Sequence, residues 1–191
     1  MDQALKVWIK LTMTIGEEIP VLGNWFNLYF TENNGMAFGL QFGGEWGKLA
    51  LSIFRILAIV AIFVYVYMLS KKKSGNGLIL SISMILAGAI GNMIDSAFYG
   101  LNFTQSSYHT VAEITSFGEG YAGFLHGKVV DMLYFPIIDI KQANAPSWMP
   151  DFLFGYDSHF IFFRPIFNIA DSAITLGVTW LLLFERKKLM L

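Results

Sequence analysis

Long apolar stretches alternate with polar segments along the chain, a pattern typical of a protein that crosses a membrane several times. The three longest apolar stretches are residues 49–69, 77–97 and 166–184. A helix of about 20 apolar residues is long enough to cross the hydrocarbon core of a bilayer. We therefore predict three complete spans, each a single helix.

The first fifteen residues follow a different pattern, because Asp2, Lys6 and Lys10 interrupt their apolar positions. This segment is too short and too charged to cross a bilayer alone. A signal peptide would carry its charges ahead of an apolar region and end in small residues, and this segment does neither. We read residues 1–15 as the outer half of a first span whose other half is missing or misannotated.

Basic residues near the span ends predict the orientation. Lys71, Lys72 and Lys73 lie between the first two complete spans, and Arg186, Lys187 and Lys188 follow the last one. Loops rich in Lys and Arg stay on the cytoplasmic side. Both termini are then cytoplasmic, and the segments 16–48 and 98–165 lie outside.

The outer segments contain strand-like runs at residues 25–30 and 160–163, set among glycines and prolines. The predicted fold is an all-α membrane protein, a four-helix transmembrane bundle that carries a small β-rich extracytoplasmic region on the outer membrane surface. Residues 1–191 form one integral membrane domain in this reading.

Composition narrows the possible functions. Hydrophobic residues make up 55% of the 191 residues and charged residues only 14%, which favours the membrane class. Basic and acidic residues nearly balance, 13 against 14, so we expect no nucleic-acid partner. The chain has no cysteine, which excludes disulfides, a thiolate nucleophile and cysteine-ligated metals. It also contains neither an HExxH nor a GxSxG motif.

Two aspartates stand at the ends of apolar stretches, where an ionisable side chain costs about 2.5 to 3.5 kcal/mol. Asp95 follows Asn92 by three residues, and Asp171 follows Asn168 by three residues. Residues three apart share one helical face, so two helices are expected to present the same Asn/Asp pair. The predicted orientation puts both pairs at one depth near the outer surface, where they could face each other.

A third carboxylate, Asp131, lies in an apolar outer segment that could approach Asp171. Two neighbouring carboxylates share one proton, so the pair can activate water and protonate a leaving amine. Three other interpretations remain open at this point. The aspartates could be interfacial helix ends with the asparagines as interhelical hydrogen-bonding groups, they could form a proton relay in a transporter, or the chain could be an inactive scaffold.

Five ordered segments carry a family resemblance: residues 2–6 (DQALK), 33–38 (NNGMAF), 91–95 (GNMID), 127–131 (GKVVD) and 167–171 (FNIAD). Over essentially its whole length the chain resembles the lipoprotein signal peptidase family, the bacterial signal peptidase II.

The resemblance implies that Asp131 and Asp171 are the catalytic pair of an aspartic endopeptidase. The residues that it implies for shaping the site and binding substrate are Asn33, Gly35, Asn92, Asp95, Asn168, Asp2 and Lys6. The implied substrate is a prolipoprotein that carries diacylglycerol on a cysteine, cut just before that cysteine without a metal or an organic cofactor. The implied setting is the bacterial inner membrane, with the site at the extracytoplasmic face, lipids as neighbours and the protein as a monomer.

The chain departs from the family pattern in three places. Ser96 stands where the family usually has arginine after the third-segment aspartate, and Arg55 or Lys6 could supply the missing charge, although snorkelling explains Arg55 on its own. Residues 98–126 and 139–164 are longer than expected and could form a lid or dock a partner. The family also has more of the first span than residues 1–15 provide.

Overall fold

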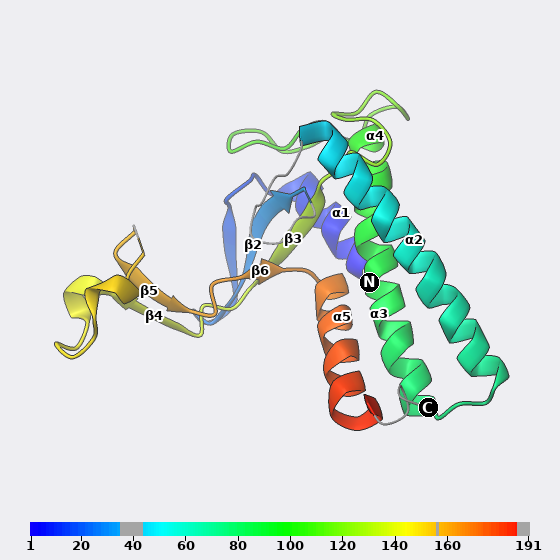
Figure 1. Ribbon diagram of the computed structural model, residues 1–191. Coiled ribbons are helices and arrows are strands. Elements are labelled where there is room, and N and C mark those ends of the chain that lie inside the picture. Colours follow the sequence, from blue (N-terminus) through cyan, green and yellow to red (C-terminus); the bar gives the residue numbers. More distant parts are fainter. Residues whose placement is uncertain (35–43, 156, 187–191) are drawn as a thin grey trace.

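The computed structural model describes residues 1–34, 44–155 and 157–186, and its helices lie to one side of a small sheet (Figure 1). The helices are α1 (Asp2–Thr12), α2 (Gly44–Lys71), α3 (Asn76–Ile94), α4 (Gly100–Asn102) and α5 (Ile169–Trp180). The strands are β1 (Glu18–Leu22), β2 (Phe26–Asn33), β3 (Val129–Tyr134), β4 (Ile138–Lys141), β5 (His159–Phe162) and β6 (Ile166–Phe167). Short π-helical turns continue two of the helices, Asp95–Tyr99 after α3 and Leu181–Glu185 after α5.

Two helices of the described chain are long and apolar enough to cross a membrane, Trp46–Lys71 and Asn76–Asn102. They correspond to the first two predicted spans. The prediction of a four-helix transmembrane bundle is not confirmed, because among the described residues only these two helices are long and apolar enough. The third predicted span also starts too early, since Ile166 and Phe167 form a strand and the helix begins at Ile169.

The strands form two separate sheets, so the description of the fold as all-α is not exact, although the small β-rich region was predicted. Strands β1, β2, β3 and β6 pair in that order, and the three pairings are antiparallel. Strands β4 and β5 form a hairpin of their own. The segment around Asp131, predicted to dip towards the bundle, is β3, one of the two inner strands of the four-stranded sheet. Because β6 is followed at once by α5, the sheet and the helices meet at Asn168.

A compact apolar core joins α1 to the sheet and to the end of α3. Its buried members are Ile9, Met13, Phe30, Tyr99, Phe103, Val130 and Met132. On the other side, the exposed face of α2 is apolar, with Phe54, Leu57 and Phe63 each at least 60% exposed. Such a face suits a lipid environment.

Helices α3 and α5 approach each other closely at glycines. A Cβ atom on Gly88 would lie 2.2 Å from the carbonyl oxygen of Ala170, and one on Gly177 would lie 2.5 Å from that of Ser81. Only glycine fits at these contacts, as expected for small residues between membrane helices. The approach matters for function because Ala170 immediately precedes Asp171.

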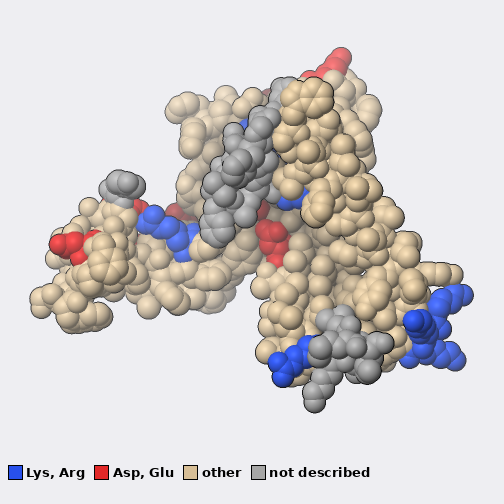
Figure 2. Space-filling model, in the orientation of Figure 1, with Lys and Arg blue, Asp and Glu red and all other residues tan. Residues whose placement is uncertain are grey.

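The two ends of the helical part differ in charge. Figure 2 shows Lys and Arg gathered at the helix ends far from the sheet. Lys71 ends α2 there, Lys72 and Lys73 follow it in a turn, and Arg186 is the last described residue of the helix that α5 begins; all four are exposed. The two lysines at 187 and 188, which also entered the orientation argument, lie outside the described residues.

Candidate active site

The capping interactions at the start of α5 fix the position of Asp171. Asn168 is the N-cap of this helix, and its side-chain oxygen accepts a hydrogen bond of 2.9 Å from the N–H of Asp171. In return, Asp171 Oδ2 accepts one of 3.3 Å from the N–H of Asn168. This reciprocal capping box fixes both side chains at the start of the helix. Asn168 thus precedes the helix, which corrects the prediction that both residues lie on one helical face.

Asp131 lies in the middle of β3, where it is only 3% exposed. Asn33, at the end of the neighbouring strand β2, donates its Nδ2 to Asp131 Oδ2. Asn168 donates its Nδ2 to Asp131 Oδ1 at 2.6 Å. Both oxygens of the carboxyl group therefore have an amide donor, one from the sheet and one from the start of α5.

A single asparagine therefore lies between the two predicted catalytic carboxyl groups. The oxygen of Asn168 caps Asp171 and its nitrogen bonds to Asp131. Asn92 on α3 completes the arrangement, since its Nδ2 donates to Asp171 Oδ1 at 2.7 Å and its oxygen accepts from Asn168 at 3.0 Å. The sheet, α3 and α5 each contribute a side chain, so the site exists only in the assembled fold.

Burial is the main influence on the protonation of Asp131. Burial and, to a smaller extent, the neighbouring charge of Asp171 raise the pKa of this carboxyl, against the opposing effects of Asn168, Lys6 and Asn33, and the net result is a pKa of about 7. A carboxyl group with a pKa near neutrality can hold a proton at physiological pH and still release it. Asp171 and Asn92 are partly exposed, so the pair can be reached from their side.

Asp95 occupies a different position from the predicted one. It is fully buried, and Lys6 Nζ lies 2.8 Å from its Oδ2. Gln3 Nε2 donates to its Oδ1 at 2.8 Å, and the N–H of Val130 donates to Oδ2 at 3.1 Å. The expectation that Asp95 faces Asp171 is therefore wrong, because Asn92 is the α3 residue that bonds to Asp171. Asp95 instead joins α1, α3 and β3.

Lys6 and Asp2 connect α1 to the same network. Lys6 Nζ donates to Asn92 Oδ1 at 2.8 Å and lies 3.2 Å from Asp2 Oδ2. Asp2 Oδ1 accepts from the N–H of Ala170 at 2.9 Å, in the first turn of α5. The two residues named by the resemblance therefore contact the residues around the carboxyl pair, and Asn92 lies between Lys6 and Asp171.

An uncharged residue, Ser96, occupies the position where the family usually has arginine. Ser96 is buried, and its hydroxyl donates to the carbonyl oxygen of Asn92 at 3.3 Å. The cation beside Asp95 is Lys6. Arg55 on α2 interacts electrostatically with Asp171. Both residues considered as replacements for the arginine thus act on an aspartate of the network.

The sequence interpretation missed part of this arrangement. Lys10 is fully buried and forms an ion pair with Glu32 on β2, while Ser106 lies 2.9 Å from Lys10 Nζ. Asp2, Lys6 and Lys10 are spaced four residues apart, which places them on one helical face. That spacing was the available signal for a charged face of α1 directed into the protein. Gly35, also named as a site residue, lies outside the described residues.

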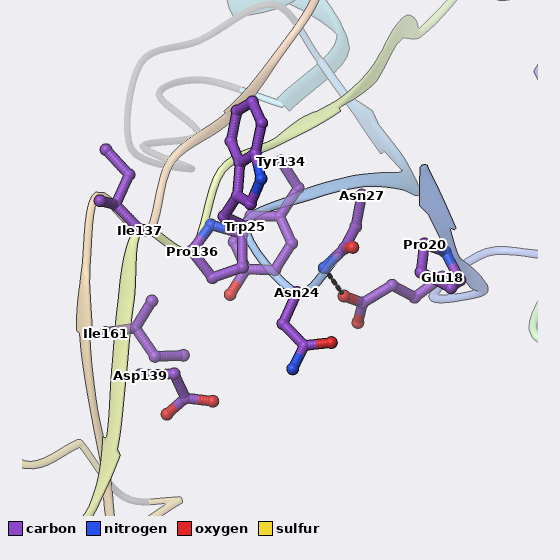
Figure 3. A pocket seen from close by; sticks show the side chains of 10 residues that line it. All are labelled: Glu18, Pro20, Asn24, Trp25, Asn27, Tyr134, Pro136, Ile137, Asp139 and Ile161. Carbon is purple, nitrogen blue, oxygen red and sulfur yellow. Dashed lines mark hydrogen bonds between the residues drawn. The ribbon is translucent and has the colours of Figure 1, made fainter. Parts of the chain in front are cut away.

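A separate hollow of about 810 Å³ lies where the sheet meets the β4–β5 hairpin. Figure 3 shows Glu18, Asn27 and Tyr134 on the sheet side and Asp139 and Ile161 on the hairpin side. None of the residues around the carboxyl pair lines it. Within the described parts of the chain, no group of three His, Asp or Glu side chains is placed to hold a metal ion.

Comparison with solved structures identifies the class of protein. A bacterial membrane enzyme solved by the in meso method at 2.3 Å resolution is 27% identical, with a TM-score of 0.55, and the match covers 97% of this chain and 80% of that one. Another, solved at 1.9 Å resolution, is 28% identical with a TM-score of 0.54, and the match covers 95% and 82% of the two chains. The apolar helices and these likenesses together define a membrane enzyme.

Sequence relatives identify the family. Residues 1–186 match the family described as Signal peptidase (SPase) II. A lipoprotein signal peptidase of Porphyromonas gingivalis (strain ATCC 33277) is 42% identical over 183 residues, which are 95% of this chain and 76% of the relative. One from Amoebophilus asiaticus is 40% identical over 189 residues, 97% of this chain and 73% of the relative. The chain belongs to the signal peptidase II family, which confirms the resemblance and makes it a peptidase.

Proposed function

We propose that the chain is an intramembrane aspartic endopeptidase that removes the signal peptide from diacylglyceryl-modified prolipoproteins, cutting just before the lipidated cysteine. The observation that carries the proposal is the position of Asn168, which bonds to Asp131 and caps Asp171. Family membership supports the substrate class, since the relatives named above are lipoprotein signal peptidases. The sequence alternatives of a transporter and of an inactive scaffold gain no support from these comparisons.

In the proposed mechanism, Asp131 holds the proton and Asp171 acts as the base. The raised pKa of Asp131 supports this division, because it favours the protonated carboxyl near neutral pH. Asp131 then donates a hydrogen bond to the scissile carbonyl oxygen. Asp171 takes a proton from a water molecule as its oxygen attacks the carbonyl carbon. The tetrahedral intermediate collapses as the C–N bond breaks, and Asp171 passes the proton that it took from water to the leaving amine of the cysteine, which restores both carboxyl groups to their starting states.

The surrounding residues have supporting roles in this proposal. Asn33, Asn92 and Asn168 hold the two carboxyl groups through amide donors. Lys6, Asp2 and Asp95 hold α1 against α3 and α5, as their ion pairs and hydrogen bonds suggest. We further propose that the chain works as one domain and as a monomer in the bacterial inner membrane, with the carboxyl pair at the extracytoplasmic side and both termini in the cytoplasm.

The test is cleavage of a diacylglyceryl-modified prolipoprotein by the purified chain in lipid or detergent. Asp131→Asn and Asp171→Asn should each abolish cleavage while leaving the melting temperature measurable and the protein monodisperse. Asp151→Asn, which changes an exposed carboxylate, should cleave like the unchanged protein. Cleavage that survives either dyad substitution, or product that begins elsewhere than at the modified cysteine by mass spectrometry, would overturn the proposal.

A further inference from the structure

The second long insertion forms an arm that projects from the rest of the molecule. We call residues 137–165 the arm, of which 137–155 and 157–165 are described. Its two strands pair from Ile138 with Phe162 to Lys141 with His159. Figure 1 shows the arm leaving the sheet sideways, across the direction of the helices and away from them. The arm therefore adds an extended surface beside the helical part.

The described part of the arm has no interior. None of the residues in 137–155 and 157–165 is buried. Its exposed large apolar side chains are Ile137, Ile138, Trp148, Phe152, Leu153, Phe162 and Phe163, with Trp148 at 78% and Phe152 at 83% exposure. A two-stranded hairpin is marginally stable on its own in water. An apolar surface of this kind marks a place where the protein contacts something else.

The carboxylates of the described arm each have a partner within the arm. His159 Nδ1 lies 2.7 Å from Asp139 Oδ1, and Arg164 donates to Asp157 at 2.9 Å. Gln142 Nε2 donates to Asp151 Oδ1 at 3.1 Å. Paired or hydrogen-bonded carboxylates cost less to bring against a medium of low dielectric constant than isolated ones. The arm thus combines apolar exposure with carboxylates that are already paired or hydrogen-bonded.

The attachment of the arm restricts where its apolar side chains can lie. Residues 163–165 alone separate β5 from β6, and Asn168 alone separates β6 from α5. Phe163 contacts Phe167 edge to face, with ring centroids 5.9 Å apart. Helix α5 then exposes apolar side chains such as Leu176, which is 60% exposed. The arm therefore leaves the molecule at the end of a helix whose exposed surface suits lipid.

We propose that the arm is a lipid-binding element that lies along the surface of the bilayer and inserts Trp148 and Phe152 between the lipid headgroups. Trp is enriched at this interface because its apolar ring carries a polar N–H group. The opposite charges of the arm nearly balance, so apolar insertion rather than attraction to anionic lipid is the expected source of binding. This proposal concerns membrane contact and does not depend on which peptide bond the enzyme cuts.

Because the chain has no cysteine, a single introduced cysteine carries the only label. Phe152→Cys and, independently, Trp148→Cys are labelled with an environment-sensitive fluorophore and placed in phosphatidylcholine vesicles containing nitroxide-labelled lipids. Phe63→Cys, on the exposed apolar face of α2, is the control for lipid contact. Ser116→Cys, an exposed loop position outside the arm, is the control for water contact.

Labels at Phe152 and Trp148 should be quenched by the lipid nitroxides, most strongly by nitroxides near the headgroups, with blue-shifted emission relative to Ser116. Labels that iodide quenches as readily as at Ser116 would overturn the proposal, because the arm would then lie in water. Labels shielded from both iodide and the lipid nitroxides would overturn it too, since a protein partner or a second copy would then cover the arm. Every variant is first required to cleave substrate or to show the thermal transition of the unchanged protein.

Discussion

The arrangement of the site depends on a single asparagine. Asn168 uses its side-chain oxygen to begin α5 and its nitrogen to hold Asp131. Other N-cap residues supply the oxygen, but serine and aspartate lack the amide nitrogen. The identity of this residue is therefore explained by the two contacts together, one structural and one directed at the proposed catalytic pair.

Asn168→Ser separates these two contacts. Serine is a good N-cap, so the melting temperature should fall only slightly, by the equivalent of less than about 1 kcal/mol. The amide donor to Asp131 and to Asn92 is lost, so we expect a marked loss of cleavage with folding retained. Asn168→Ala, which removes both contacts, should lose stability as well. Equal activity of Asn168→Ser and the unchanged protein would show that the amide nitrogen is not needed.

The raised pKa of Asp131 predicts how activity depends on pH. With a pKa of about 7, the protonated form that we propose as active is present below that pH and is lost above it. Cleavage should therefore decline on the alkaline side, approaching about tenfold per pH unit when one proton is required. The measurement is the rate of cleavage across a pH series, under conditions in which the protein stays folded.

Asn33→Ala provides the matched variant for this pH series. The hydrogen bond from Asn33 favours the ionised form of Asp131 and so lowers its pKa. Its removal should move the alkaline limb to higher pH, whatever happens to the maximum rate. A limb that stays in place or moves to lower pH would mean that another group controls it.

At the scale of the elements, the sequence predicted what local patterns determine. The apolar length of α2 and α3 and the strand-like runs that became β2 and β5 were found in this way. The start of α5 was missed because the apolar run continues through Ile166 and Phe167, which pair with β3. The capping signal was present in the sequence, since Asn168 precedes Asp171 by three residues. If this capping signal had been weighed against the apolar run, the start of α5 would have been predicted correctly.

The position of Asp95 could not be predicted in the same way. Helical spacing correctly relates Asn92 to Asp95, but it does not say which neighbouring element each residue meets. Lys6 and Gln3 reach Asp95 from α1, a contact between segments about ninety residues apart in the chain. Such a contact depends on how the elements pack against one another, and the periodicity of the sequence contains no information about that. Periodicity therefore could not say which of the predicted site residues pair with one another.

Close packing of α3 against α5 leads to a prediction about Gly88. In Gly88→Ala the new methyl would lie 2.2 Å from the carbonyl oxygen of Ala170 and 2.6 Å from Ile174 Cγ1, so one helix must shift. Overpacking of this kind costs about 1 to 3 kcal/mol. Because Asp171 follows Ala170, we expect both a lower melting temperature and reduced cleavage.

Gly123→Ala is the control for this substitution. Apart from Gly123 itself and its two chain neighbours, no residue has an atom within 4 Å of a Cβ at this position, so its methyl should change neither stability nor cleavage. Both variants are compared by thermal unfolding in detergent and by the cleavage assay. If Gly88→Ala behaves like Gly123→Ala, the contact between the helices does not set the position of Asp171.

At the scale of the whole molecule, the exposed lysines and the carboxyl pair lie at opposite ends of the helices. Lys71, Lys72 and Lys73 lie at the end far from the sheet, whereas the carboxyl pair lies where the sheet meets α5 (Figures 1 and 2). Basic loops are retained in the cytoplasm, so the site should open to the other side, where translocated polypeptides emerge.

Lys72→Cys and Ser116→Cys test this orientation with a membrane-impermeant maleimide on intact cells. Ser116→Cys should be labelled from outside, and Lys72→Cys only after the membrane is permeabilised. The reverse labelling would place the carboxyl pair on the cytoplasmic side, and a substrate that has already crossed the membrane could not reach it there.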